Sequence, residues 1–327
     1  MKSLFFMHST KLIRYLIAWR VNTSMVRLPL DFSALLSKTL SKAIADRLST
    51  KDARVWRKCL DTERQQMFNA SATGGTNIKD NYPETPWPIH AIILPHTSKR
   101  NYGHNETILW ELKLIGDNAD HGFFLEAILP AMEQLSFEPK GRLNVWGHFD
   151  IQHIWVANGN AWDPLIVDGQ LNLRYHPKPL QWSSHFSERT YTREMTHQKN
   201  LVFLTPFEFA PQHVGQMKDQ FLPDMTILLE SLIRRWSFFT SSKIQKEIWD
   251  LLPASILSEV KKAWETASTM KIQSYNISPA LKDAPGLWKG ELQYREIPFF
   301  LLPYLDMAAI LHVGHKTHYG CGTFVMC

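Results

Sequence analysis

Residues 311–326 read LHVGHKTHYGCGTFVM, and this stretch decides how the rest of the chain is interpreted. An apolar helical pattern precedes it, and a short strand-like run, 323–326, closes it. The loop between them holds three glycines, three histidines and one lysine. Glycine lets a backbone approach a ligand closely, consecutive exposed N–H groups cradle an anion, and histidine supplies an acid or base near neutral pH. The pattern suggests binding of a phosphate backbone, with cleavage as the further step.

Other segments form an ordered series with this loop. Residues 203–207 read FLTPF and precede an apolar helical segment with two arginines at 234–235, and residues 286–292 read GLWKGEL. In the first half, 86–89 read PWPI and 112–116 read LKLIG. By their order and spacing, these segments and the loop resemble the CRISPR repeat-processing endoribonucleases of the RAMP superfamily.

The loop pattern of that family supports the resemblance position by position. The pattern runs hVGxxTxxGxGxF after a helix. It places five residues of this chain in register: Gly314, Thr317, Gly320, Gly322 and Phe324. His315 stands where the family often has lysine, and Lys316 follows one place later.

The resemblance implies an α+β fold of two tandem ferredoxin-like (RRM-like) domains with a C-terminal glycine-rich loop. We expect an N-terminal domain over 1–175, a connector over 176–197 and a C-terminal domain, with the loop, over 198–327. The coarse order of elements expected in each half, β-α-β-β-α-β, agrees with this fold class.

Local periodicity predicts the individual elements. Apolar residues alternate at 15, 17, 19 and 21, which indicates a strand over 11–21, and an apolar stripe indicates a helix over 33–48. The other expectations for the first half are strands at 89–94 and 107–115, a helix at 122–135, a hairpin at 142–157 turning near Gly147, a mobile loop at 69–85 and a polar connector at 158–197. Those for the second half are strands at 199–209, 270–277 and 287–296, helices at 222–239 and 299–312, and an extra helical segment at 243–266 broken at Pro253.

Composition is that of an ordinary globular chain with a mild basic excess. Hydrophobic residues make up 44% and charged residues 20% of the 327 positions, and the formal net charge is +5. A basic excess suits a polyanionic partner. The three cysteines, Cys59, Cys321 and Cys327, form no C-x-x-C pair, which argues against a disulfide-stapled secreted domain and predicts a cytoplasmic protein. No stretch approaches the length of a membrane span.

The loop histidines allow three interpretations. His312, His315 and His318 recur every three residues, which on a helix would align metal ligands. The glycines favour a loop instead, either one that contacts RNA or a structural helix C-cap with incidental histidines. We expect no metal ion and no cofactor.

The resemblance implies roles for residues in and around the loop. His315 and His318 are the candidate acids or bases, Lys38 and Lys42 on the first helix the candidate electrostatic stabilisers, and Tyr319 a group that orients the reacting hydroxyl. A solvated helix face is the alternative for the two lysines, as Asp46 continues their row. The candidate RNA contacts are Gly314, Lys316, Thr317, Gly320, Gly322, Arg234, Arg235, Lys99 and Arg100.

The leading hypothesis is a metal-independent endoribonuclease that cuts CRISPR precursor RNA within its repeats. The resemblance implies attack by the RNA 2′-OH, giving 2′,3′-cyclic phosphate and 5′-OH ends. The partners would be repeat RNA and other CRISPR effector subunits, with no membrane. One alternative is a non-catalytic repeat-binding subunit, since the chain has no histidine between His8 and His90. Another is a domain that binds a nucleotide or small anion through the loop.

Overall fold

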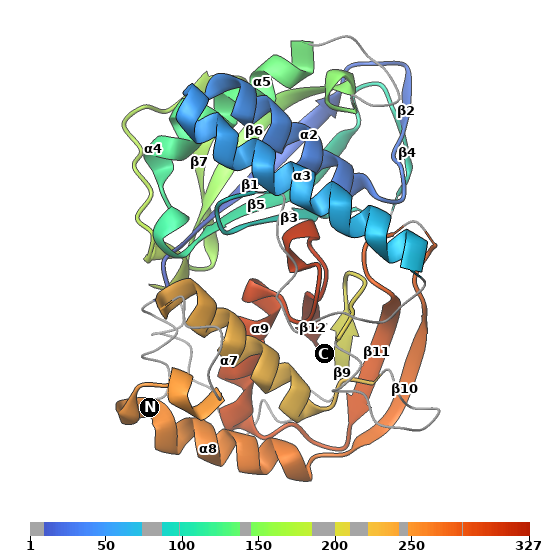
Figure 1. Ribbon diagram of the computed structural model, residues 1–327, viewed down its shortest axis with the longest axis vertical. Helices are drawn as coiled ribbons and strands as arrows, with labels where there is room; N and C mark the ends of the chain where they lie inside the picture. Colours follow the sequence, from blue (N-terminus) through green and yellow to red (C-terminus); the bar gives the residue numbers. More distant parts are fainter. Residues whose placement is uncertain are drawn as a thin grey trace. The chain divides into compact units, whose positions relative to one another are not determined.

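The chain divides into two units in its computed structural model (Figure 1). The N-terminal unit is Leu12–Trp182, and the C-terminal unit is Ser183–Cys327 together with Met1–Lys11. The structure describes residues 10–73, 87–97, 99–137, 145–184, 200–209, 222–241, 248–282 and 284–327.

The N-terminal unit is built on a six-stranded antiparallel sheet with the order β3-β5-β1-β6-β7-β8. Its central strand, β1, is the strand that alternation predicted. The strands are β1 (Leu12–Val21), β3 (Ala91–Pro95), β5 (Thr107–Ile115), β6 (Phe149–Asn158), β7 (Ala161–Val167) and β8 (Gln170–Leu171). A separate two-stranded ribbon joins β2 (Met25–Arg27) to β4 (Asn101–Gly103).

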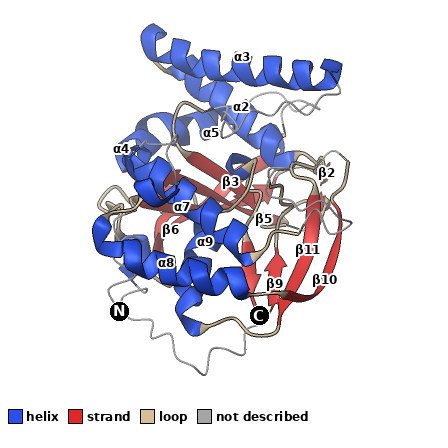
Figure 2. Ribbon diagram, turned by 60° about the horizontal axis from the view of Figure 1, so that its bottom comes forward, coloured by secondary structure: helices blue, strands red, loops and turns tan. Residues whose placement is uncertain are grey.

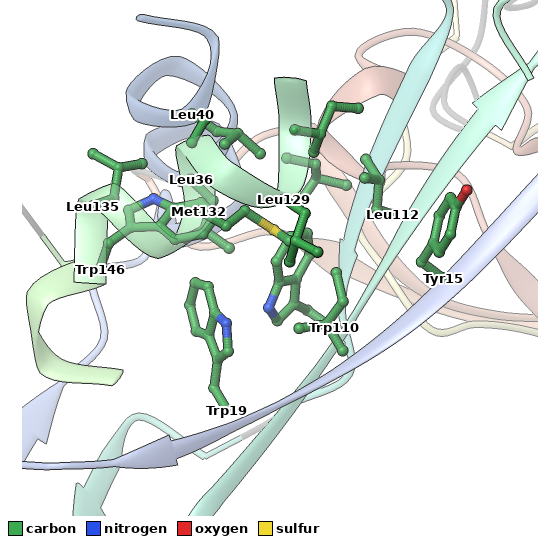
Figure 3. Close-up of a cluster of buried hydrophobic side chains, with 14 of the residues drawn as sticks. Tyr15, Trp19, Leu36, Leu40, Trp110, Leu112, Leu129, Met132, Leu135 and Trp146 are labelled. Carbon is green, nitrogen blue, oxygen red and sulfur yellow. The ribbon is translucent and has the colours of Figure 1, made fainter. Parts of the chain in front are cut away.

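Helices cover one face of this sheet and enclose the core of the unit. They are α2 (Phe32–Arg47), α3 (Thr50–Thr73), α4 (His121–Phe123) and α5 (Leu129–Phe137). Of these, α2 and α5 pack on the strands and α3 packs on α2. Trp19 of β1 is 1% exposed and lies against Trp110 and Trp146, with ring centroids 5.2 and 4.6 Å away. Leu36 and Leu40 of α2 close the same cluster (Figure 3). The alternation from 15 to 21 and the stripe of the first helix are therefore confirmed as core positions.

The predicted helix over 122–135 exists but changes its winding before Pro130. Residues Phe124–Ile128 form a π-helical turn between α4 and α5. Proline has no N–H to donate and its ring crowds the preceding turn, so a locally wider turn accommodates it within a continuous helical segment.

Several local predictions for the N-terminal unit were wrong. α3 extends to Thr73, so residues 69–73 are helical and not a loop, while 74–86 lie outside the described residues. The hairpin turns at Gly159, where φ is +57°, whereas Gly147 sits in a 3-10 turn held by the buried side chain of Trp146. The polar stretch from 158 onward contains β7 and β8 before any connector.

The C-terminal unit contains a four-stranded antiparallel sheet with the order β10-β11-β9-β12. Its strands are β9 (Asn200–Phe203), β10 (Ile272–Pro279), β11 (Trp288–Tyr294) and β12 (Phe324–Met326). Its helices are α7 (Met225–Ser241), α8 (Ala254–Thr269) and α9 (Leu302–Leu311). β9 is shorter than the strand expected over 199–209. α8 begins after Pro253, and residues 243–247 of the expected extra helix lie outside the described residues.

The two units share a strand order. In the N-terminal unit β1 lies between β5 and β6, and in the C-terminal unit β9 lies between β11 and β12. In each sheet the first strand therefore lies between two strands that are joined by a helix. This helix is α5 in the N-terminal unit and α9 in the C-terminal unit. Among the helices in the described ranges, none combines the length and apolar character that a membrane crossing requires.

A buried ionic cluster crosses the N-terminal sheet. Arg14 Nε on β1 donates to Glu111 Oε1 on β5 at 2.6 Å, and His96 Nε2 lies 3.4 Å from Glu111 Oε2. Glu111 is 1% and Lys113 2% exposed. Burial alone would raise the pKa of the Glu111 carboxyl, but the Arg14 and Lys113 cations and the hydrogen bonds from His96 and Arg14 hold it well below its usual range.

Replacing Glu111 with glutamine removes this charge and leaves Arg14 without the carboxylate that it pairs with. We expect a loss of about 3 kcal/mol in the free energy of unfolding at neutral pH, measured by urea denaturation. The folded-state pKa lies below the unfolded value of about 4.3, so the contribution is present above that pH and fades as the pH falls toward the folded-state pKa.

The matched control is Glu106→Gln, because Glu106 precedes the same strand but is exposed and pairs with Lys99 at the surface. This control should change stability little. An equal loss in the two variants, or a loss for Glu111→Gln that does not shrink in acid, would contradict the buried pairing.

Candidate functional site: the glycine-rich loop

The glycine-rich loop (312–323) connects α9 to β12 and crosses its own backbone. Gly322 has φ +79°, and a Cβ atom placed on it would lie 1.8 Å from the Val313 carbonyl oxygen. Gly314 has φ +85°, and a Cβ there would lie 2.3 Å from the Glu208 carbonyl oxygen. Both positions combine a left-handed backbone with a contact that excludes any side chain, so the loop requires glycine at each.

The FLTPF segment and the residue after it lie directly against the loop. Phe203 packs on Phe324, with ring centroids 5.5 Å apart. Three loop amides donate to this segment: Gly322 N to Pro206 O at 2.9 Å, His315 N to Glu208 O at 2.7 Å, and Thr323 N to Thr205 Oγ1 at 3.2 Å. Two of the segments that the sequence analysis grouped by order, FLTPF and the loop, are therefore in contact in the C-terminal unit.

Helix α7 supports the loop from one of its faces. Ser231 and Arg235 are four residues apart, so they lie on one side of the helix. Gly314 N donates to Ser231 Oγ at 2.8 Å, and Arg235 Nε donates to the carbonyl of Leu311, the last residue of α9, at 2.9 Å. Arg235 is 5% exposed. It anchors the helix end, and its burial favours this role over a contact with RNA.

The anion cradle expected from consecutive loop amides stays a prediction, and the hydrogen bonds of the loop limit where it can lie. Most of the loop N–H groups already donate to protein acceptors. Those with partners are Val313, Gly314, His315, Tyr319, Gly320, Gly322 and Thr323. A backbone amide that is already paired is not free to bind a phosphate oxygen, so at these seven positions side chains must carry any anion recognition.

The three histidines occupy different environments. His312 is fully buried, and its Nδ1 lies 3.2 and 3.0 Å from the carbonyl oxygens of Gly320 and Cys321. Since both neighbours only accept hydrogen bonds, Nδ1 carries the proton and His312 closes the loop. His318 is 7% exposed and its ring lies 4.0 Å from that of Tyr319, itself 5% exposed.

The tip of the loop, 314–316, is the partly exposed part of 311–324. It presents the His315 side chain and the Lys316 ammonium group. Lys316 Nζ pairs with Glu208 Oε2 at 2.9 Å and keeps 41% of its side chain exposed. The tip therefore offers an imidazole beside a cation, which are groups suited to proton transfer and to phosphate binding.

Cys321 lies under the tip and stays a thiol. It is 1% exposed, and burial, opposed in part by Lys316, raises the pKa of its thiol to about 12. A group that is protonated at neutral pH is a poor nucleophile. Cys321 therefore fills space beneath the loop.

The remaining candidates are surface cations with varied partners. Lys42 is exposed and Lys38 partly exposed on α2 of the N-terminal unit. Lys99 pairs with Glu106, and Arg100 Nε donates to the Leu28 carbonyl at 3.3 Å. In the C-terminal unit, Arg234 pairs with Glu230 at 2.7 Å, four residues back along α7.

His121 of the N-terminal unit was not among the candidate site residues predicted from the sequence. His121, at the start of α4, lies with Nδ1 3.0 Å from the Tyr15 hydroxyl. Burial and the neighbouring His176 lower the pKa of His121, so its neutral form prevails at pH 7. The sequence offered only a histidine next to a predicted helix start, which is too common to single out.

Comparison with known families supports the sequence resemblance over the C-terminal unit. Residues 201–324, from β9 to the start of β12, match the family described as CRISPR-associated endoribonuclease Cas6. The similarity to CRISPR repeat-processing proteins of the RAMP type is thereby confirmed. No curated protein sequence matches the chain at a significant level.

Solved structures share its fold at low identity. A chain of the "Partial Cas6-RT-Cas1--Cas2 complex" aligns over 97% of this chain and 46% of its own, with TM-score 0.50 and 10% identity. The "Cas6-RT-Cas1--Cas2 complex" gives the same TM-score and identity over 97% of this chain and 29% of its own. A Cas6 product complex aligns over 97% and 100% with TM-score 0.48 and 15% identity. This chain spans less than half the length of the first two.

Substituting Gly322 with alanine should break the crossing of the loop. The new methyl group must displace the Val313 carbonyl and also hold a strained φ, so we expect a loss of about 3 kcal/mol or more in the free energy of unfolding, measured by urea denaturation. Gly169→Ala is the control, because Gly169 has φ +76° but nothing within 4 Å of the added atom. It should cost about 1 kcal/mol. Equal losses would contradict the close approach.

Proposed function

We propose that this chain is a metal-independent endoribonuclease that cleaves CRISPR precursor RNA within its repeats. The observation that carries the proposal is the family match over 201–324, which coincides with a loop whose glycines are sterically required and whose tip presents His315 and Lys316. Repeat RNA is the proposed substrate, and other CRISPR subunits in the cytoplasm are the proposed partners.

The proposed fold class is two tandem ferredoxin-like domains. In each sheet the first strand lies between the third and the fourth, with a helix after the first strand and another after the third. That is the order of the ferredoxin-like motif. The N-terminal sheet adds β7 and β8 at one edge, and the C-terminal unit adds α8.

The proposed reaction moves two protons and makes one phosphate bond as another breaks. A base takes the proton of the RNA 2′-OH, the oxygen attacks the adjacent phosphorus, and an acid protonates the departing 5′ oxygen. The products are a 2′,3′-cyclic phosphate and a 5′-OH. Each proton transfer typically contributes about 10²–10⁴-fold to the rate, and a cation stabilises the charge that develops on the phosphorane.

Among the loop residues, His315 is our first choice as acid or base. Its partial exposure at the tip favours it over His318, which is 7% exposed. Lys316 is an adjacent cation, and Lys38 and Lys42 of α2 remain candidates for electrostatic stabilisation. Tyr319 is nearly buried against His318, which favours a role in shaping the loop over contact with the reacting hydroxyl.

A non-catalytic repeat-binding subunit is the second candidate. The observation that favours it is the absence of histidine from 9–89, which includes all of α2. This candidate predicts tight repeat binding with no product. A small-anion-binding domain is less favoured because so many loop amides are already paired.

The first experiment incubates the purified chain with labelled repeat RNA in EDTA. We expect cleavage that a 2′-deoxy residue at the cut site abolishes, with a 2′,3′-cyclic phosphate at the new end. His315→Ala should lower the single-turnover rate by about 10²–10⁴-fold while RNA affinity is retained.

The control variant is His104→Ala, since His104 is an exposed histidine outside the loop. It should cleave at the wild-type rate. Binding without cleavage by the wild type would favour the non-catalytic subunit. Full activity in a chain with both His315→Ala and His318→Ala would exclude a histidine mechanism at the loop.

A further inference from the structure

Glu208 contacts every residue of the loop tip, 314–316. Its main-chain carbonyl accepts a hydrogen bond from His315 N at 2.7 Å, and the same oxygen would lie 2.3 Å from a Cβ atom on Gly314. Its carboxylate Oε2 lies 2.9 Å from Lys316 Nζ. One residue outside the loop therefore influences both the backbone and the charge of the part that a ligand would meet.

The main chain that carries Glu208 is fixed by its neighbours. Glu208 lies shortly after β9, which pairs with β11 in the C-terminal sheet (Figure 2). Phe207, directly before it, is fully buried, and its N–H donates to the Trp288 carbonyl at 2.7 Å. The Phe207 carbonyl accepts from Leu287 N and Trp288 N at 3.2 and 3.0 Å. The Glu208 side chain therefore extends from a main chain that is already ordered.

Lys316 is fixed at its own end of the pair as well. Its φ is +54°, in the left-handed region that residues other than glycine adopt rarely, and its carbonyl accepts from Tyr319 N at 3.0 Å. A conformation of this kind persists where surrounding contacts hold it. Because both main chains are ordered, the ion pair loses less conformational entropy on forming than a pair between two mobile segments.

The two partners of this ion pair differ in exposure. The Glu208 side chain is 14% exposed and the Lys316 side chain 41% exposed. Oε2 of Glu208 is buried, and its contact with the ammonium group lacks regular hydrogen-bond geometry, so charge holds the pair. A ligand that approaches from solvent reaches the ammonium group more readily than the carboxylate, and an anionic ligand can take the place of that carboxylate.

An anion that belongs to the protein competes with free anions at a high effective concentration. For groups joined by short flexible links this concentration is about millimolar, and the ordered main chains at 208 and 316 favour a higher value. A free phosphate ion has to displace the carboxylate by its own affinity alone. A phosphate of an RNA chain is brought to the tip by the other contacts of that chain, so it too acts at a high effective concentration.

We propose that Glu208 is a specificity-determining residue of the loop: its carboxylate occupies Lys316 as an internal counter-ion and reserves this cation for a phosphate of a bound RNA chain. Free phosphate and small phosphorylated molecules are thereby excluded from the tip. The inference rests on the proposed function for the class of ligand and adds how the tip discriminates against small anions. Glu208 acts through Lys316 and needs no contact with the RNA.

The test measures binding of the full chain to labelled repeat RNA that carries a 2′-deoxy residue at the cut site. Fluorescence anisotropy is recorded while inorganic phosphate replaces chloride at constant ionic strength, and the exchange should leave the wild-type affinity unchanged. Glu208→Gln should bind the RNA about twofold to fivefold more tightly, since no carboxylate has to be displaced, and phosphate should reverse this increase. The slope of log K against log salt should steepen by up to about 1.

Glutamine suits this test because it retains the main-chain carbonyl that binds His315 N, so the backbone of the tip keeps its support. Glu208→Asp, which withdraws the carboxylate by one methylene group, should give the same changes at smaller size. The control is Glu265→Gln, which removes the same charge from an exposed position on α8 of the same unit. It should match the wild type in RNA affinity and in its response to phosphate.

A double-mutant cycle with Lys316→Gln shows whether Glu208 acts through Lys316. In the Lys316→Gln background, Glu208→Gln should no longer tighten RNA binding, because the carboxylate has no cation to occupy. An increase in affinity that persists there would reflect general electrostatic attraction and would overturn the proposal. Equal affinity and equal phosphate sensitivity of Glu208→Gln and the wild type would overturn it as well.

Failure of this proposal and failure of the proposed function give different results. A wild-type chain that binds no RNA would overturn the proposed function, and the role of Glu208 with it. RNA binding without cleavage of the all-ribose repeat would overturn the nuclease activity alone, since RNA affinity and phosphate competition still decide whether Glu208 acts as a counter-ion.

Discussion

The contact between Gly322 and the Val313 carbonyl determines the shape of the glycine-rich loop. The two ends of the loop cross there, and Val313 N also donates to Gly322 O at 3.1 Å. No side chain fits at this crossing, so residue 322 must carry a hydrogen atom in place of a side chain. Because the crossing holds the ends together, residues 314–316 project as a short tip, and everything that the loop offers a ligand is concentrated in those three positions.

The direction of the loop hydrogen bonds sets the kind of chemistry that is available. In a phosphate-binding helix N-terminus or nest, backbone amides point outward at the anion. Here the amides of four loop residues point inward, to Pro206, Glu208, Thr205 and Ser231. At these positions recognition of a phosphate must come from side chains. Lys316 is already paired with Glu208, so binding an RNA phosphate there means exchanging a carboxylate partner for a phosphate partner, and ionic strength will weaken both.

The sequence predicted long periodic elements and motif-bearing segments well. The strand at Leu12–Val21 and the helix at Phe32–Arg47 have unbroken apolar patterns, and the apolar positions that the pattern selects are buried. The helix also buries Ser33, Ser37 and Ser41, which the pattern does not select. α3 was missed because two buried side chains, Ala53 and Trp56, hold its first turns, and a sparse stripe is a weak signal. The inward direction of the loop amides was beyond reach, because glycine spacing indicates where a backbone bends and carries no information on where its N–H groups point.

Residues 9–89 contain no histidine, so a group of the N-terminal unit that takes part in the second proton transfer must be of another kind or lie elsewhere in that unit. His121 is neutral at pH 7, but the Tyr15 hydroxyl beside it stays protonated, since burial raises the pKa of that hydroxyl far above its ordinary value. His121 Nδ1 lies 3.0 Å from this hydroxyl, which can donate to it or accept from it, so Nδ1 is engaged in a hydrogen bond in either tautomer. A proton transfer through Nδ1 would first have to break that bond. Among the candidates of this unit, the α2 lysines Lys38 and Lys42 thus remain the cations to weigh beside His315, and an ordinary lysine stabilises charge more readily than it exchanges protons at neutral pH.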